Sequence, residues 1–342
     1  MKSSNIGGQA VMEGIMMRSG DQYSVGVRKP DGDIEVKVEP YHSWAKGKKL
    51  WKLPIFRGVV SFFESLVVGM KCLTYSASFY EDEEEDQKKK EEMSQEEKAR
   101  AEAKKEKQDQ WIMYGTVAFS VVLSVALFIL LPYFLASFLR KVTQSEGIIA
   151  VAEACVRMLL FLGYLLLISR MKDIQRVFMY HGAEHKCINC IEHGLELNVE
   201  NVMKSSREHK RCGTSFLLFV MIVSIIFFLF IRVSSPWLRV VVRLLLMPVI
   251  AGVSYEIIRL AGRSENPVVV LLSKPGLALQ KLTTREPEPD MVEVAIEAVE
   301  AVFDWKAYLH ENFPETVIRD DDPQSRGVPD DSSAEKVCGG EI

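Results

Sequence analysis

The residues from 111 to 139 read WIMYGTVAFSVVLSVALFILLPYFLASFL, an apolar run with Trp and Tyr side chains near its ends. A helix of about 20 apolar residues crosses the hydrocarbon of a bilayer, and Trp and Tyr gather where such a helix meets the headgroups. The stretch therefore predicts a membrane-spanning helix, and it decides the class of fold to which the rest of the chain belongs.

Three more apolar stretches follow, at residues 148–169, 216–233 and 238–260. The first of them carries Glu153 and Arg157 four residues apart, a spacing at which two charges pair on one helix face inside a bundle. The last stretch holds more charge than lipid alone would permit: Arg239, Arg243, Glu256 and Arg259. We expect a mainly α-helical fold, a polytopic membrane bundle of about four transmembrane helices in a lipid bilayer, with a small N-terminal β element.

Basic residues concentrate in the connection between the second and third predicted spans. They are Arg170, Lys172, Arg176, Lys186, Lys204, Arg207, Lys210 and Arg211. The two opposite connections are short and hold few basic residues, and an excess of Lys and Arg is typical of cytoplasmic loops. We therefore expect a multi-pass protein of the cell membrane whose N-terminus, central loop and C-terminus are cytoplasmic.

Outside the bundle the composition changes from segment to segment. Residues 22–28 and 34–38 alternate in polarity on either side of a Pro-Asp-Gly-Asp turn, which predicts a β-hairpin. The expected order is a β-rich cytoplasmic segment at 1–53, an amphipathic or embedded helix at 54–80, a charged linker at 81–110, the bundle at 111–265 with a cytoplasmic loop at 170–213, a cytoplasmic helical segment at 266–310 and a disordered tail at 311–342. The alternative for 54–80 is a full span, which its internal charges disfavour.

Charge and cysteine content exclude several classes of protein. A formal net charge of −4 at pH 7, without a basic stripe interleaved with aromatics, argues against nucleic-acid binding. Six cysteines in 342 residues are too few and too unevenly spaced for the disulfide framework of a small secreted domain. We expect these side chains to be reduced thiols or metal ligands.

Residues 181–185 read His-Gly-Ala-Glu-His, the H-x-x-E-H pattern of the inverted zincins. On a helix, His181 and His185 lie one turn apart on a shared face, so both imidazoles reach one cation. Glu184 lies close enough to hold or deprotonate a metal-bound water. The pattern predicts a divalent metal site with zinc as the first candidate. The alternative is that these polar residues cap a membrane helix at the interface.

A second pattern overlaps the first. Cys187 and Cys190 precede His209 and Cys212 at a spacing close to that of a zinc ribbon, in which four soft ligands close a tetrahedral site. Two histidines with one or two further ligands would instead leave a position open for water. The candidates for these further ligands are His209, Cys212 and Glu256, and the alternative for Glu256 is an ion pair with an arginine inside the bundle.

The segment GGQAVMEG at 7–14 is rich in glycine but lacks the polarity of a loop. It fits neither a phosphate loop nor a dinucleotide fingerprint. Glycines in such a stretch imply that something approaches the backbone closely. We expect a tight β-turn packed against the membrane helices, and the alternative is that Glu13 supplies a carboxylate to a catalytic site.

Four segments resemble those of the YqhQ-like bacterial membrane proteins, a family of unknown function usually labelled as predicted metal-dependent enzymes. The segments are GGQAVMEGIMMR at 7–18, HGAEHK at 181–186, RCGTSF at 211–216 and YEIIR at 255–259. The resemblance extends to about residue 310 and leaves out the charged linker and the tail. It implies a pattern that comprises His181, Glu184, His185, His209 and Cys212. Because Cys187 and Cys190 are not in that pattern, the resemblance shifts weight away from a zinc ribbon.

These observations favour a membrane-embedded metal-dependent enzyme, a hydrolase, in which Glu184 polarises or deprotonates water and Glu13 or Arg211 orients the substrate. One alternative is a metal sensor, carrier or transporter that uses the same ligands. Another is a scaffold that needs no metal. The substrate and the oligomeric state, including a homo-oligomer, are left open.

Overall fold

The computed structural model describes residues 2–47, 51, 53–80, 111–112, 114–231, 233, 235–262 and 266–314. The predicted charged linker at 81–110 and the predicted disordered tail beyond residue 314 lie outside the described residues.

Four helices among the described residues are long and apolar enough to cross a membrane. They are Tyr114–Ser137, α5 (Glu146–Ile168), α8 (Gly213–Phe230) and α9 (Pro236–Ala261). The first contains a π-helical turn, η2 (Ala126–Leu130), followed by α4 (Leu131–Ser137) and a 3₁₀ turn, η3 (Phe138–Lys141). Large apolar side chains such as Leu159 and Leu245 point outward, 69% and 72% exposed, as expected of a lipid-facing surface. The predicted bundle of four helices that are apolar enough to span a membrane is confirmed among the described residues.

The N-terminal β element is a four-stranded antiparallel meander in the order β1-β2-β3-β4. Its strands are β1 (Gly7–Val11), β2 (Gly14–Ser19), β3 (Gln22–Arg28) and β4 (Ile34–Pro40). The predicted hairpin is β3 and β4, paired from Arg28 and Ile34 to Gln22 and Pro40. The glycine-rich segment forms the β1–β2 hairpin, and Glu13 adopts a positive φ of 47° in its turn.

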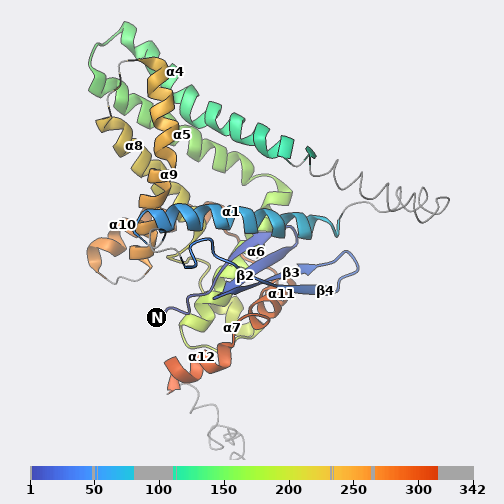
Figure 1. Ribbon diagram of the computed structural model, residues 1–342. Helices are drawn as coiled ribbons and strands as arrows, with labels where there is room; N and C mark the ends of the chain where they lie inside the picture. Colours follow the sequence, from blue (N-terminus) through green and yellow to red (C-terminus); the bar gives the residue numbers. More distant parts are fainter. Residues whose placement is uncertain are drawn as a thin grey trace, which may run out of the picture.

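The core of the extramembrane unit lies between the sheet and two helices, one from the middle and one from near the end of the described chain. Helix α6 (Lys172–Glu192) and helix α11 (Pro289–Glu300) pack on β1, β2 and β3, with α7 (Val199–Lys204) and α12 (Trp305–Asn312) beside them. Tyr180, Ile188 and Met291 are at most 1% exposed in this core. Figure 1 shows this unit on one side of α1 and the membrane bundle on the other.

Helix α1 (Phe56–Ala77) lies across the base of the bundle (Figure 1) and is not among the four candidate spans. Gly58 lets it approach α9, since a Cβ there would come within 2.9 Å of the Gly252 carbonyl oxygen. Its large apolar side chains, such as Phe63 and Leu66, are exposed, whereas its buried positions include Gly69 and Ser76. This distribution is typical of an amphipathic helix. Helix α10 (Pro267–Thr283) packs on α8 and α9.

Candidate metal centre

Three side chains meet where α6 and the start of α8 come together. Their ligand atoms, one from each of His181, His185 and Cys212, all lie within 4.8 Å of one another. The His181 Nε2 to Cys212 Sγ distance is 3.2 Å. In the part of the chain that the structure describes, this is the one group of three or more histidine, cysteine or carboxylate side chains close enough to share an ion.

The helix geometry explains how these residues converge. His181 and His185 are one turn apart on α6, so their rings lie 4.4 Å apart between centroids. Cys212 is the N-cap of α8, where an extended backbone turns its thiol back onto the first turn and Sγ accepts the Thr214 N–H at 3.4 Å. The thiol is thereby held next to the His181 ring.

Backbone carbonyls orient both imidazoles. His181 Nδ1 lies 2.8 Å from the Thr283 carbonyl oxygen, and His185 Nδ1 lies 2.6 Å from that of Arg207. A carbonyl oxygen only accepts, so Nδ1 carries the proton on each ring and Nε2 keeps its lone pair. Histidine ligands of metals are held in this way by a partner on the other ring nitrogen.

His209 lies next to this group and outside it. Its ring centroid is 5.6 Å from that of His185, and its buried Nε2 has no hydrogen-bond partner among the described residues. Gln280 clamps the backbone on both sides, accepting the His209 N–H at 2.9 Å and donating to its carbonyl at 2.7 Å. Burial lowers the pKa of His209, so its neutral form is favoured. The sequence suggested His209 as a further ligand, but the structure does not place it in the group of His181, His185 and Cys212.

Glu192 is the carboxylate nearest to His209, with Oε2 3.7 Å from Nε2. Burial alone would raise the pKa of this carboxyl, but the neighbouring His209 and the Arg211 guanidinium outweigh it and lower the pKa to about 2. The sequence predicted that Arg211 orients the substrate, but in the structure its guanidinium forms an ion pair with Glu192. Sequence reasoning missed Glu192, although its position two turns after His185 puts it on the same face of α6.

Glu184 is buried beside the group and is tied to the sheet. Its Oε1 accepts the Gly8 N–H at 3.0 Å. Burial raises the pKa of Glu184, while the nearby His181 imidazole and the Gly8 N–H oppose that effect. A Cβ on Gly8 would come within 2.9 Å of the Glu184 Cγ, which explains the need for glycine here. The strand β1, which holds the glycines, packs on α6 and on α1. We had expected this segment to pack against the membrane helices.

Two predicted carboxylates lie elsewhere. Glu13 forms an ion pair with Arg176, with its Oε1 2.5 Å from Nε, in the β1–β2 turn. Glu256 on α9 forms a two-point ion pair with Arg57 of α1. For Glu256 the structure therefore shows the ion pair that the sequence analysis gave as the alternative to a metal ligand. Its partner, Arg57, lies on α1 and not inside the bundle.

The cysteine pair of the predicted zinc ribbon is not part of the group. Cys187 is fully buried in the core of the extramembrane unit. The Cys190 thiol donates to the Glu196 carbonyl at 3.3 Å, and burial raises its pKa to about 11. These are the properties of inert core thiols.

The chemistry of the donor set fits a divalent cation of intermediate softness. Imidazole nitrogen and thiolate are both ligands that zinc accepts, and three protein ligands leave the fourth position of a catalytic zinc for water or substrate. The carbonyls that orient the rings gave no signal in the sequence, because any residue type can supply one.

The comparisons with known proteins identify the family of the chain. A family described as "Protein of unknown function (DUF1385)" matches residues 53–305. The chain is 38% identical over 316 residues to the "Uncharacterized protein YqhQ" of Bacillus subtilis (strain 168), which covers 90% of this chain and 94% of that relative. No solved structure matches. The resemblance read from the four segments is confirmed, and the chain belongs to the DUF1385 family of YqhQ-like proteins of unknown function.

Proposed function

We propose that the protein is a membrane-embedded metal-dependent hydrolase whose divalent cation, zinc by preference, is held by His181, His185 and Cys212. The observation that carries the proposal is the convergence of three ligand atoms within 4.8 Å, with both Nδ1 atoms tied to carbonyls. A capping role accounts for the backbone contacts of these side chains but not for the approach of His181 Nε2 to the Cys212 thiol at 3.2 Å.

The residues around the three ligands have distinct roles in this proposal. Bound there, zinc would supply a Lewis acid and a water of lowered pKa. Glu184, whose Oε1 accepts the Gly8 N–H, would accept a proton from that water on its other carboxylate oxygen. Glu13 and Glu256, engaged in ion pairs, have no part in the chemistry.

The first test is the metal content of the detergent-purified protein. We expect about one zinc per chain in the wild type and none in a His181→Ala/His185→Ala double variant. His193→Ala is the matched control, because His193 ends the same helix and lies 2.7 Å from the Asn189 carbonyl, outside the group. Equal metal in the double variant and the control, or none in any of the three after reconstitution, would overturn the proposal.

The second test separates an enzyme from a metal carrier. Glu184→Gln keeps the shape of the side chain and its acceptor oxygen for Gly8, so we expect it to retain the metal. Removal of a general base lowers turnover by about 10²–10⁴-fold, so the variant should fail to complement the phenotype of a deletion strain. Full complementation by Glu184→Gln, together with failure of Cys212→Ser, would favour the carrier or sensor.

A further inference from the structure

A partly open cavity of about 620 Å³ lies between α4, α5, α8 and α9. It is far from the metal centre, because Cys212 caps one end of α8 whereas Phe228 and Leu229 line the cavity at the other end. At about 1.5 Å per residue, α8 rises by about 20 Å from Cys212 to Ile225, the first of its residues that line the cavity. The cavity is therefore independent of the candidate hydrolase site.

Buried charges line this cavity. Arg157 of α5 and Arg243 of α9 both bind Glu153, with N–O distances of 2.7 Å and 2.5 Å. All three side chains are between 3% and 7% exposed. Charges at this depth of a membrane protein mark functional paths or sites, since an unpaired one is costly.

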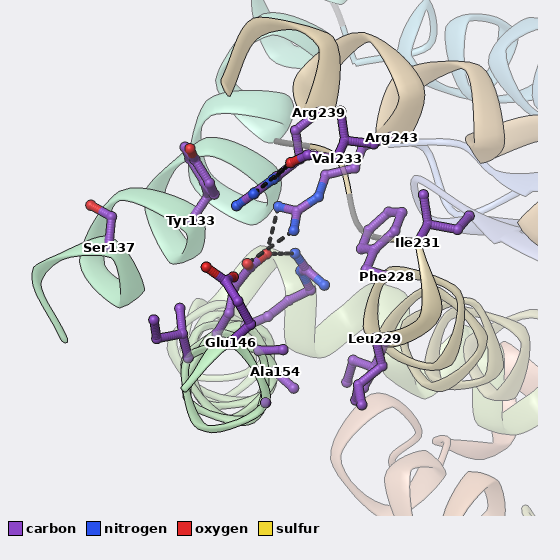
Figure 2. A pocket seen from close by; sticks show the side chains of 16 residues that line it. Tyr133, Ser137, Glu146, Ala154, Phe228, Leu229, Ile231, Val233, Arg239 and Arg243 are labelled. Carbon is purple, nitrogen blue, oxygen red and sulfur yellow. Dashed lines mark hydrogen bonds and ion pairs between the residues drawn. The ribbon is translucent and has the colours of Figure 1, made fainter. Parts of the chain in front are cut away.

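Arg239 is a third arginine of the cavity, one turn before Arg243 on α9. It donates to the Val233 carbonyl at 2.6 Å, and its guanidinium lies 5.4 Å from the Tyr133 ring centroid. Figure 2 shows Arg239 and Arg243 reaching from α9 toward the side of the cavity that carries Tyr133.

The protein backbone is adapted to hold these cations. Pro132 has no N–H to donate to the carbonyl four residues earlier, that of Phe128, at the π-helical turn. Arg157 Nε donates to this freed carbonyl at 3.1 Å. Phe228 lies 5.0 Å from the Arg157 guanidinium and 4.8 Å from that of Arg243. The guanidinium groups are thus fixed in place before any ligand arrives.

Positive charge is in excess among the described residues that line the cavity. Three arginines face two carboxylates, Glu146 and Glu153. An arginine surplus in a partly desolvated cavity favours an anion, and the planar guanidinium matches the paired oxygens of a phosphate group. The cavity extends from the start of α5 and the end of α8, the ends of these spans that would face lipid headgroups, to Arg157 in the middle of α5.

We propose that this arginine cavity, lined by Arg157, Arg239 and Arg243, is a binding site for a phosphate group. The group belongs either to an anionic lipid headgroup or to a free phosphate. Glu153 holds two of the guanidinium groups side by side, and Arg239 completes the positively charged wall.

The experiment has two arms on the full-length protein. In nanodiscs of mixed phosphatidylglycerol and phosphatidylcholine, native mass spectrometry measures which lipid stays bound. In zwitterionic detergent, thermal unfolding is followed while inorganic phosphate is added. Retained phosphatidylglycerol identifies a lipid headgroup, and a dose-dependent rise of Tm with phosphate identifies a free anion. Either outcome supports the site.

Variants then localise the binding. Arg243→Gln and Arg239→Gln should each weaken the retained interaction about tenfold or more, the loss typical of a charge-assisted contact. Arg259→Gln on the same helix, which does not line the cavity, should bind like the wild type. Arg239 is the safer variant for folding, because its described hydrogen bonds go to a carbonyl and not to Glu153.

The proposal fails if the wild type prefers neither phosphatidylglycerol nor phosphate, in which case the arginines are a structural triad with Glu153. It also fails if both variants bind as tightly as Arg259→Gln. Gel filtration of each variant serves as the readout of folding and needs no bound metal, so failure here is distinguishable from failure of the proposed hydrolase site.

Discussion

At the scale of single residues, the two histidines of α6 are set by carbonyl oxygens from distant parts of the chain. Thr283 and Arg207 determine which ring nitrogen of His181 and His185 carries the proton. The helical spacing of the histidines was visible in the sequence, and so was the candidate Cys212. Their carbonyl partners were not, because a backbone group leaves no trace in residue type.

Alkylation of the cysteines tests the separation of Cys212 from the core thiols. A metal protects a thiolate ligand, so chelation should increase the iodoacetamide reaction of Cys212 and leave that of Cys187 and Cys190 unchanged. The thiolate of Cys190, with a pKa of about 11, amounts to about one part in a thousand at pH 8, so its slow reaction should accelerate as the pH rises toward 11. Peptide mass spectrometry measures each site. Faster alkylation of Cys187 or Cys190 after chelation would show that they bind metal, as the zinc-ribbon hypothesis requires.

A substitution at Gly8 tests the contact between the glycine-rich segment and α6. A Cβ there would come within 2.6 Å of the Met16 carbonyl oxygen and 2.9 Å of Glu184 Cγ, whereas one on Gly7 would meet nothing within 4 Å. Gly8→Ala should therefore lower the free energy of unfolding by about 1–3 kcal/mol through overpacking. Gly7→Ala, the matched control, should leave it nearly unchanged. Thermal unfolding in detergent measures both, and equal effects would show that the close approach is not a constraint.

At the scale of elements, the joint between α1 and α9 explains why Glu256 is not a ligand. Arg57 reaches Glu256 from α1, and Gly58 and Gly252 bring the two helices close enough for that ion pair. The β3–β4 hairpin was predictable because its turn and its alternation are local. The partner of Glu256 was not, because it lies about two hundred residues away and depends on how α1 docks.

Glu256→Gln is predicted to separate stability from metal binding. Because the ion pair is partly exposed, its loss should cost up to about 1 kcal/mol of unfolding free energy. The metal content should stay at about one per chain. Thermal unfolding and elemental analysis of the same preparation measure the two quantities. If Glu256→Gln loses the metal but keeps its stability, Glu256 is a metal ligand and the prediction is wrong.

At the scale of the whole molecule, the sheet that precedes the spans packs on a helix that follows them. The Ser24 hydroxyl donates to the Ala298 carbonyl at 2.5 Å, and Arg28 forms an ion pair with Glu293 at 3.1 Å. A bilayer cannot lie between segments in such contact, so the sheet and α11 share one side, as four spans require. The number of predicted spans follows from hydropathy alone. The packing of the N-terminal sheet and α11 in one core could be seen only in the tertiary structure.

Reporter fusions test which side of the membrane this is. The basic loop around α6 predicts the cytoplasm, so a green fluorescent protein fused after Asn312 should fluoresce. Alkaline phosphatase inserted at the short connection between η3 and α5 should be active, because that connection faces the opposite side. If neither reporter is active, the predicted orientation is inverted. If only one reporter is active, both positions lie on the same side of the membrane and the four-span topology is contradicted.

The central claim is that one divalent cation is bound by two histidines and one cysteine, and X-ray absorption at the zinc edge of the purified protein tests it most directly. The account predicts one sulfur at about 2.3 Å and two imidazole nitrogens at about 2.0–2.1 Å, with the sulfur lost in Cys212→Ser. Two or more sulfurs, or a spectrum that Cys212→Ser leaves unchanged, would contradict it.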